Sequence, residues 1–145
     1  PIQSTTNFFY ELVESPTNIK NLEDAKKVKQ IGVLNGNVHH KFLQKKGFEN
    51  LHPTNSYVSC LKLLKYKRVD LIPLSDVALI KRLKEAGVSQ DDIQRTPVVL
   101  FKKEGYIAFS KNISDEIIIR WQKALDQLKA SGRYDKLYQD YYESF

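Results

Sequence analysis

The feature that most constrains the fold is the alternation of short apolar runs with stretches of helical period. Residues 30–34 form such a run, a turn at residues 35–37 breaks it, and apolar positions then recur at helical spacing. The same order returns at residues 50–54 with the stretch after them, and again at residues 69–74 with residues 77–87. Strands that alternate with helices are typical of a parallel sheet covered by helices. The pattern therefore predicts an α/β fold with a mainly parallel sheet.

Extended segments flank this region on both sides. Residues 8–13 are rich in aromatic and β-branched side chains, and Pro16 ends the run because proline cannot continue a strand ladder. Asn21 is expected to cap a short helix before the alternating region begins. Beyond that region, residues 96–101 and 106–110 have the composition of extended chain. We therefore expect one strand before the α/β region and two after it.

Two helices are expected to close the chain. Residues 114–130 carry acids at the start, a lysine at the end and an apolar stripe between them, and Gly132 offers a left-handed stop. Residues 134–142 follow directly as a second helix. Trp121 lies on the apolar stripe of the first helix, so we expect it to be a core residue.

Length and composition narrow the functional classes. With 145 residues, of which 41% are hydrophobic, the chain can fold around a core. The net charge is +6, but the basic residues are dispersed, which favours solvated helix faces over a nucleic-acid groove. Cys60 is the single cysteine, so an internal disulfide is excluded, and its apolar neighbours favour a core position over a catalytic nucleophile. No nucleic-acid partner is expected.

The strongest candidate site is the turn Asn35-Gly36-Asn37. Gly36 lets the backbone approach a ligand closely, and the unpaired amides of Asn37, Val38 and His39 would lie at the positive end of a helix dipole. Such a helix start is a ready seat for an anion. The Asn37 side chain either contacts the ligand or only caps its helix, and both interpretations stand equal.

A second candidate site follows the third strand of the alternating region, at Ser75 and Asp76, because ligands collect at the carboxyl ends of strands in open α/β sheets. The favoured interpretation of Asp76 alone is an acid in the first turn of a helix. His39 and His40 are adjacent and cannot form the i, i+4 pair of a zinc helix, so no metal site is expected. Neither paired carboxylates nor a Ser-His-Asp set can be placed in one site, so we expect no catalytic residues and no cofactor.

Four motifs together resemble the second half of the extracellular solute-binding proteins of family 3, the periplasmic amino-acid-type substrate-binding proteins of ABC transporters. Their order and spacing agree over nearly the whole chain. In chain order they are residues 15–33, from Ser15-Pro16 to Lys29-Gln30-Ile31-Gly32-Val33; residues 63–72, with Val69-Asp70; residues 106–111; and residues 121–137, from Trp121 to Leu137.

The resemblance implies a bilobal fold whose two lobes are joined by crossover strands, with ligand held between them. Residues 1–13 would be the outgoing crossover, residues 14–97 one α/β lobe, residues 98–112 the return crossover, and residues 113–145 helices that return to the first lobe. Most of the first lobe would be absent. Those helices are therefore expected to pack on a second copy, or on an N-terminal half of the same protein.

The implied function is capture of a small polar or anionic, amino-acid-like solute for an ABC uptake transporter, outside the cytoplasm in the periplasm. The implied partner is a membrane permease. The alternative is the ligand-sensing domain of a membrane signalling receptor, and an enzyme on this scaffold ranks below both.

In the family, the turn that matches Asn35-Gly36-Asn37 receives the carboxylate of the ligand, and an aspartate after the third strand holds its ammonium. Ser75 stands at that aspartate position here, with Asp76 one residue later. Either Asp76 has taken over this role or the ligand is not a standard α-amino acid, and the second interpretation is slightly favoured.

Overall fold

The computed structural model describes residues 1–143, which form two units. The larger unit is Thr5–Lys103, and the smaller one combines Pro1–Ser4 with the chain from Glu104 onward. The elements are, in chain order, β1 (Gln3–Leu12), α1 (Leu22–Ala25), β2 (Ile31–Leu34), α2 (Val38–Lys45), β3 (Leu51–Thr54), α3 (Tyr57–Lys65), β4 (Ile72–Ser75), the 3-10 turn η1 (Asp76–Ala78), α4 (Leu79–Ala86), η2 (Gln90–Asp92), β5 (Ile93–Gly105), α5 (Asp115–Ala130) and α6 (Arg133–Glu143).

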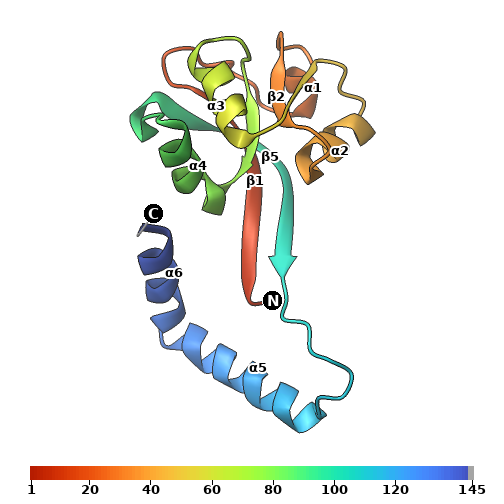
Figure 1. The fold of residues 1–145 in the computed structure, drawn as a ribbon, viewed down its shortest axis with the longest axis vertical. Helices are drawn as coiled ribbons and strands as arrows, with labels where there is room; N and C mark the ends of the chain where they lie inside the picture. The colour runs from red at the N-terminus through yellow and green to blue at the C-terminus, as the bar shows by residue number, and fades with distance from the viewer. Residues whose placement is uncertain (144–145) are drawn as a thin grey trace. The chain divides into compact units, whose positions relative to one another are not determined.

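The larger unit contains the predicted parallel strands (Figure 1). Strand β2 pairs in parallel with β3, and a parallel bridge from Ile31 to Leu71 links β2 to the chain entering β4. Strand β1 pairs antiparallel with β4 and has β5 on its other side. Because β2, β3 and β4 run in the same direction, their carboxyl ends open on one edge. The predicted α/β fold class is confirmed.

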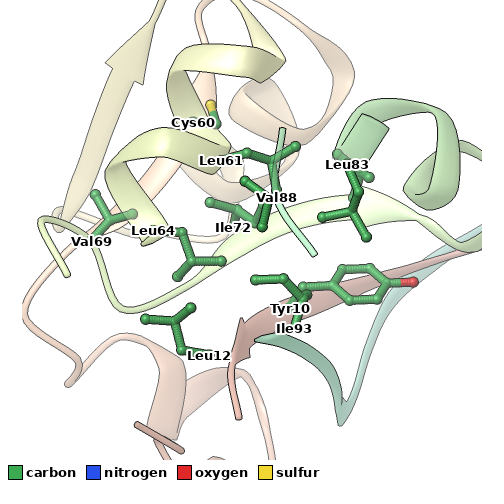
Figure 2. Packing of buried hydrophobic residues seen from close by; sticks show 11 residues of the cluster. Tyr10, Leu12, Cys60, Leu61, Leu64, Val69, Ile72, Leu83, Val88 and Ile93 are labelled. Atoms are coloured by element: carbon green, nitrogen blue, oxygen red, sulfur yellow. The ribbon is translucent and has the colours of Figure 1, made fainter. Parts of the chain in front are cut away.

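Helices cover both faces of these strands. Successive side chains of β1 point alternately into two buried clusters, one on each face. Tyr10 and Leu12 face a cluster with residues of α3 and α4, whereas Phe9 faces another cluster with residues of α2 and β2. Figure 2 shows the first cluster, in which Leu61 and Leu64 of α3 lie over Ile72. Asn7, Phe9 and Glu11 therefore share the α2 side of β1.

A close approach of two strands explains why glycine stands at position 32. A Cβ atom there would lie 3.3 Å from side-chain carbons of both Ile72 and Val69. At the entry to the same strands, the Asp70 carboxylate accepts a hydrogen bond of 2.9 Å from the Gln30 amide. The absence of a side chain at Gly32 thus lets β2 lie close to β4, and the hydrogen bond of Asp70 ties the two strands together where they begin.

Some sequence predictions differ from the observed elements. Residues 106–110 are irregular, whereas β5 is a single strand from Ile93 to Gly105. Pro97 does not interrupt it, because β5 lies at the edge of its sheet and proline is tolerated there. The N-cap of α3 is Ser56, whose side chain accepts a hydrogen bond from the Ser59 amide.

The smaller unit contains α5 and α6, whose predicted positions are confirmed, with Gly132 at a left-handed φ of 71° between them. No residue of α5 is buried. Trp121 is 58% exposed, so its predicted core position is wrong within this chain. A groove of about 450 Å³ runs beside it, lined mainly by apolar side chains that include Ile107, Phe109 and Leu125. Among the described helices, none has the length and apolar character needed to span a membrane.

Candidate functional site

The turn before α2 has the backbone geometry of an anion seat. Gly36 has a φ of 69°, and a Cβ atom added there would meet nothing within 4 Å, so the turn has an open side. Among the described residues, the backbone amides of Val38 and His39 have no hydrogen-bond acceptor. The amide of Asn37 is not available, because it donates to the Leu34 carbonyl at 3.2 Å. Two of the three backbone amides expected in the anion-binding turn are therefore available to a ligand at the positive end of the α2 dipole.

The Asn37 side chain has partners at both of its polar atoms. Its Oδ1 atom accepts from the His40 amide at 2.9 Å, which is the bond of a helix cap. Its Nδ2 atom donates to the Tyr57 hydroxyl at 2.8 Å and lies 3.3 Å from Nδ1 of His39. The capping interpretation is thus observed, and a direct contact between Asn37 and a ligand stays a prediction.

Tyr57 joins this site, although the sequence pattern favours an apolar helix face for it and no binding role. Because its oxygen accepts from Asn37, the hydroxyl hydrogen remains available to donate to a ligand. The Arg82 guanidinium lies 4.9 Å from the centre of the tyrosine ring, and its Nη1 atom is paired with the Glu85 carboxylate at 2.7 Å. Burial raises the pKa of Tyr57, so the hydroxyl stays protonated at neutral pH. The sequence signal was its place in the first turn of α3, directly after a strand that ends on the same edge as β2.

Ser75 and Asp76 lie at the carboxyl end of β4, as predicted from the sequence. Ser75 is paired with Asn7 of β1. The Asp76 carboxylate accepts from the amides of Thr6 at 3.1 Å and Val77 at 2.9 Å through one oxygen, so it ties η1 to β1. Burial, followed by the charge of Asp76, raises the pKa of nearby Tyr10 to about 12. The bonds of Asp76 are those of a helix-start acid, and its role toward a ligand ammonium stays a prediction.

Strand β1 brings the two predicted sites together. Nε2 of His39 lies 2.7 Å from Oδ1 of Asn7, and Asn7 is the residue that faces Ser75 across the β1–β4 pair. The turn of α2 and the end of β4 therefore share one polar edge. Lys103 adds a further positive charge that acts on His39. Two free amides, a hydroxyl donor and the nearby positive charge of Lys103 suit the carboxylate of a small polar solute.

The burial of α2 differs from the sequence-based expectation. The apolar spacing of the sequence predicts that Val38 faces the interior with Leu43, but Val38 is 41% exposed, and His39 and His40 are buried with Leu43 instead. Both rings are retained in the interior because each has a hydrogen bond: His40 accepts from the Gly36 amide at 3.0 Å, and His39 bonds to Asn7. The sequence pattern counted both histidines as polar and so could not place them inside.

Cys60 lies in the core, as expected. It is 2% exposed, its sulfur lies 2.8 Å from the Thr54 hydroxyl, and burial raises the pKa of its thiol. A thiol that is buried and kept protonated is poorly suited to nucleophilic chemistry.

No protein-family model matches the chain, and no curated protein matches its sequence. Solved structures do match over nearly its whole length. The second substrate-binding domain of GlnP from Lactococcus lactis, in an open conformation, is 21% identical with a TM-score of 0.74, and the match covers 100% of this chain and 61% of that one. The amino-acid ABC transporter substrate-binding protein AbpA from Streptococcus pneumoniae, bound to L-arginine, is 19% identical with a TM-score of 0.70, covering 99% and 59%.

A histidine kinase sensor domain described as similar to periplasmic binding proteins also matches, at 18% identity and a TM-score of 0.63, covering 92% of this chain and 57% of that one. At these identities the likeness establishes the fold. The chain spans roughly three fifths of the length of each of these structures. The chain therefore has the periplasmic-binding-protein-like fold of these three structures and matches part of each of them.

Proposed function

We propose that the chain binds a small polar or anionic solute of the amino-acid type at the edge formed by the α2 turn and the end of β4. The solute carboxylate would accept hydrogen bonds from the amides of Val38 and His39 and from the Tyr57 hydroxyl. The observation that carries the proposal is the pair of free amides at the start of α2, in a fold whose solved relatives include a domain bound to L-arginine.

The proposed role is delivery of this solute to the permease of an ABC uptake transporter, in the periplasm. The AbpA structure supports this role, because that protein is described as an amino-acid ABC transporter substrate-binding protein. The chain itself would perform no chemistry, since the edge offers hydrogen-bond donors and charge but no nucleophile beside a base.

A second candidate function is ligand sensing by a membrane receptor, which the histidine kinase sensor domain favours. Both functions use the same binding step and differ in what the solute-loaded chain contacts. A pull-down against the two classes of membrane partner, permease and receptor kinase, separates them: binding that depends on added solute is expected with one class only.

The binding step is tested by titrating the ¹⁵N-labelled chain with L-arginine, L-glutamine and L-glutamate in separate series. At least one of them is expected to shift the backbone amides of Val38 and His39 in a saturable manner. The methyl and amide signals of the smaller unit, around Trp121, serve as the internal control and are expected to stay in place. Shifts confined to that unit, or none with any amino acid, would contradict the proposal.

A further inference from the structure

A continuous line of hydrogen bonds connects the α2 turn with β1 and β5 through two buried side chains. Asn7 and His39 are each only 3% exposed. Nδ2 of Asn7 donates to the Phe101 carbonyl at 3.3 Å, and Oδ1 of Asn7 lies 2.7 Å from Nε2 of His39. On the other side of the ring, Nδ1 of His39 lies 3.3 Å from Nδ2 of Asn37, which also caps α2.

The direction of every bond in this line follows from its two ends. The His40 amide can only donate, so the atom of Asn37 that faces it is the oxygen, and Nδ2 of Asn37 must be a donor toward His39. The Phe101 carbonyl can only accept, so Oδ1 of Asn7 is the atom that faces the imidazole. His39 must therefore carry its hydrogen on Nε2 and a lone pair on Nδ1.

The surroundings of His39 favour this neutral form. Burial, followed by the positive charge of Lys103 on β5, lowers the pKa of His39 to about 4. The other groups that face the ring are uncharged: Asn7 on β1, Asn37 at the head of α2, and the Phe101 ring, whose centre lies 5.6 Å away.

We propose that His39 is the positioning residue of the ligand-binding turn. Its neutral imidazole ties the turn to β1 and β5, and protonation of the imidazole releases the turn. A second hydrogen on Nδ1 would point at the Asn37 amide, where two donors cannot bond. Asn37 would have to turn away, and it could then no longer hold both the His40 amide and the Tyr57 hydroxyl. The arrangement of the Val38 and His39 amides would be lost with it. The inference depends on the proposed function only in treating this turn as the ligand site.

The first test needs no ligand and no variant. The ¹⁵N shifts of the His39 ring at pH 7 are expected to show a protonated Nε2 and an unprotonated Nδ1, with slow exchange of the Nε2 hydrogen. The opposite tautomer, or a charged ring at pH 7, would overturn the inference because the line of bonds could not then exist.

The second test follows the free chain during acidification. In the wild-type chain, the side-chain amide of Asn7 and the backbone amides of Asn37 and Val38 are expected to shift together with a midpoint near that of His39. The transition should disappear in His39→Gln, which keeps a donor toward Asn7 but does not titrate. It should persist in His52→Gln, which removes an exposed imidazole on β3. Signals that move with unrelated midpoints, or that keep the transition in His39→Gln, would overturn the inference.

The third test adds L-glutamine, whose charge does not change between pH 7 and pH 3. If ligand binds only with neutral His39, the apparent dissociation constant roughly doubles by pH 4 and reaches about 11 times its neutral-pH value by pH 3. In His39→Gln it should stay flat. Binding without this dependence would overturn the inference and leave the proposed function standing. Failure of every amino acid to bind at pH 7 would contradict the proposed function, while the ligand-free transition would still decide the role of His39.

Discussion

Gly36 is the residue on which the shape of the α2 turn depends, because its φ of 69° is unfavourable for any residue with a Cβ atom. Gly47, at the other end of α2, has a φ of 77° and an equally open Cβ direction. The two glycines therefore impose the same backbone requirement and differ in their distance from the proposed site.

This pair allows a matched experiment. Gly36→Val and Gly47→Val should each lower the free energy of unfolding by about 1–2 kcal/mol, since both force a β-branched residue into a left-handed conformation. Only Gly36→Val should also abolish the amide shifts caused by added amino acid. Equal ligand binding in the two variants, measured by the same NMR titration, would remove the α2 turn from the site.

Tyr57 allows a test of a single hydrogen bond. Tyr57→Phe removes the hydroxyl that accepts from Asn37 and that would donate to the ligand, so affinity should fall about 5- to 20-fold. The control is Tyr66→Phe, because Tyr66 is 68% exposed and follows α3 at the opposite end of the helix from Tyr57. Isothermal titration calorimetry measures both. A Tyr57→Phe chain with the affinity of Tyr66→Phe would show that the hydroxyl does not touch the solute.

At the scale of elements, β1 is held at both ends of its buried face by polar side chains. Near one end, Asn7 bonds to Phe101 and His39. Near the other, the buried carboxylate of Glu11 accepts from the amide and hydroxyl of Thr17 at 2.8 and 2.5 Å, and from the Gln94 side chain at 2.8 Å. These bonds fix β1 to β5 and to the loop that follows β1.

Glu11→Ala should therefore destabilise the chain by about 1–3 kcal/mol, because it leaves three partly buried donors without an acceptor. Glu14→Ala, three residues later, removes only an exposed ion pair with Lys67 and should cost at most about 1 kcal/mol. Urea unfolding followed by circular dichroism gives both values. A loss for Glu11→Ala as small as that for Glu14→Ala would show that this anchor does not hold the strand.

The pairing of α2 with β1 makes stability depend on pH in a defined window. The unfolded histidine has a pKa of about 6.5, whereas His39 in the folded chain has a pKa of about 4, so the unfolded state binds the proton first. As the pH falls from about 6.5 to about 4, this difference should remove up to about 3 kcal/mol of stability. Below pH 4 the loss from His39 should stop.

Urea unfolding of wild type and His39→Gln at several pH values isolates this contribution, because the carboxylates are the same in both chains. The difference in unfolding free energy between the two should change across that window. A constant difference would contradict the buried, neutral state of His39.

Whether an element could be predicted from the sequence depends on how far apart in the sequence its interacting residues lie. The order of strands, turns and helices around Gly36 could be predicted because period and turn chemistry are local. The full length of β5 could not, since residues 93–95 and 102–105 extend the expected segment only through the pairing of β5 with β1, which is far away in the sequence. The burial of His39 depends on Asn7, 32 residues away, and the role of Tyr57 on Asn37, 20 residues away. Such polar pairings leave no periodic signal in the sequence.

At the scale of the whole molecule, the apolar surface of α5 is the feature that the described chain leaves without cover. Ile117, Ile119 and Trp121 are 43%, 52% and 58% exposed. Such a surface is rarely left open on a soluble monomer. We propose that it is covered by a second copy of the chain or by an N-terminal half of the same protein.

Light scattering of the isolated chain at micromolar concentration is expected to show a dimer or a larger species, with blue-shifted Trp121 fluorescence. Trp121→Glu should restore a monomer by placing a charge on the apolar face. Tyr66→Glu, at an equally exposed aromatic residue, should not. A wild-type chain that stays monomeric over this range, with solvent-exposed Trp121, would count against self-association.

The central claim is that the edge formed by α2, α3 and the end of β4 holds the carboxylate of an amino-acid-like solute. The most direct measurement is a crystal structure of the chain soaked with the amino acid that binds best in the NMR titrations. The account predicts a carboxylate within hydrogen-bond distance of the Val38 and His39 backbone nitrogens and of the Tyr57 hydroxyl. A solute seated elsewhere on the chain, such as in the apolar groove beside Trp121, with the α2 amides left open, would contradict it.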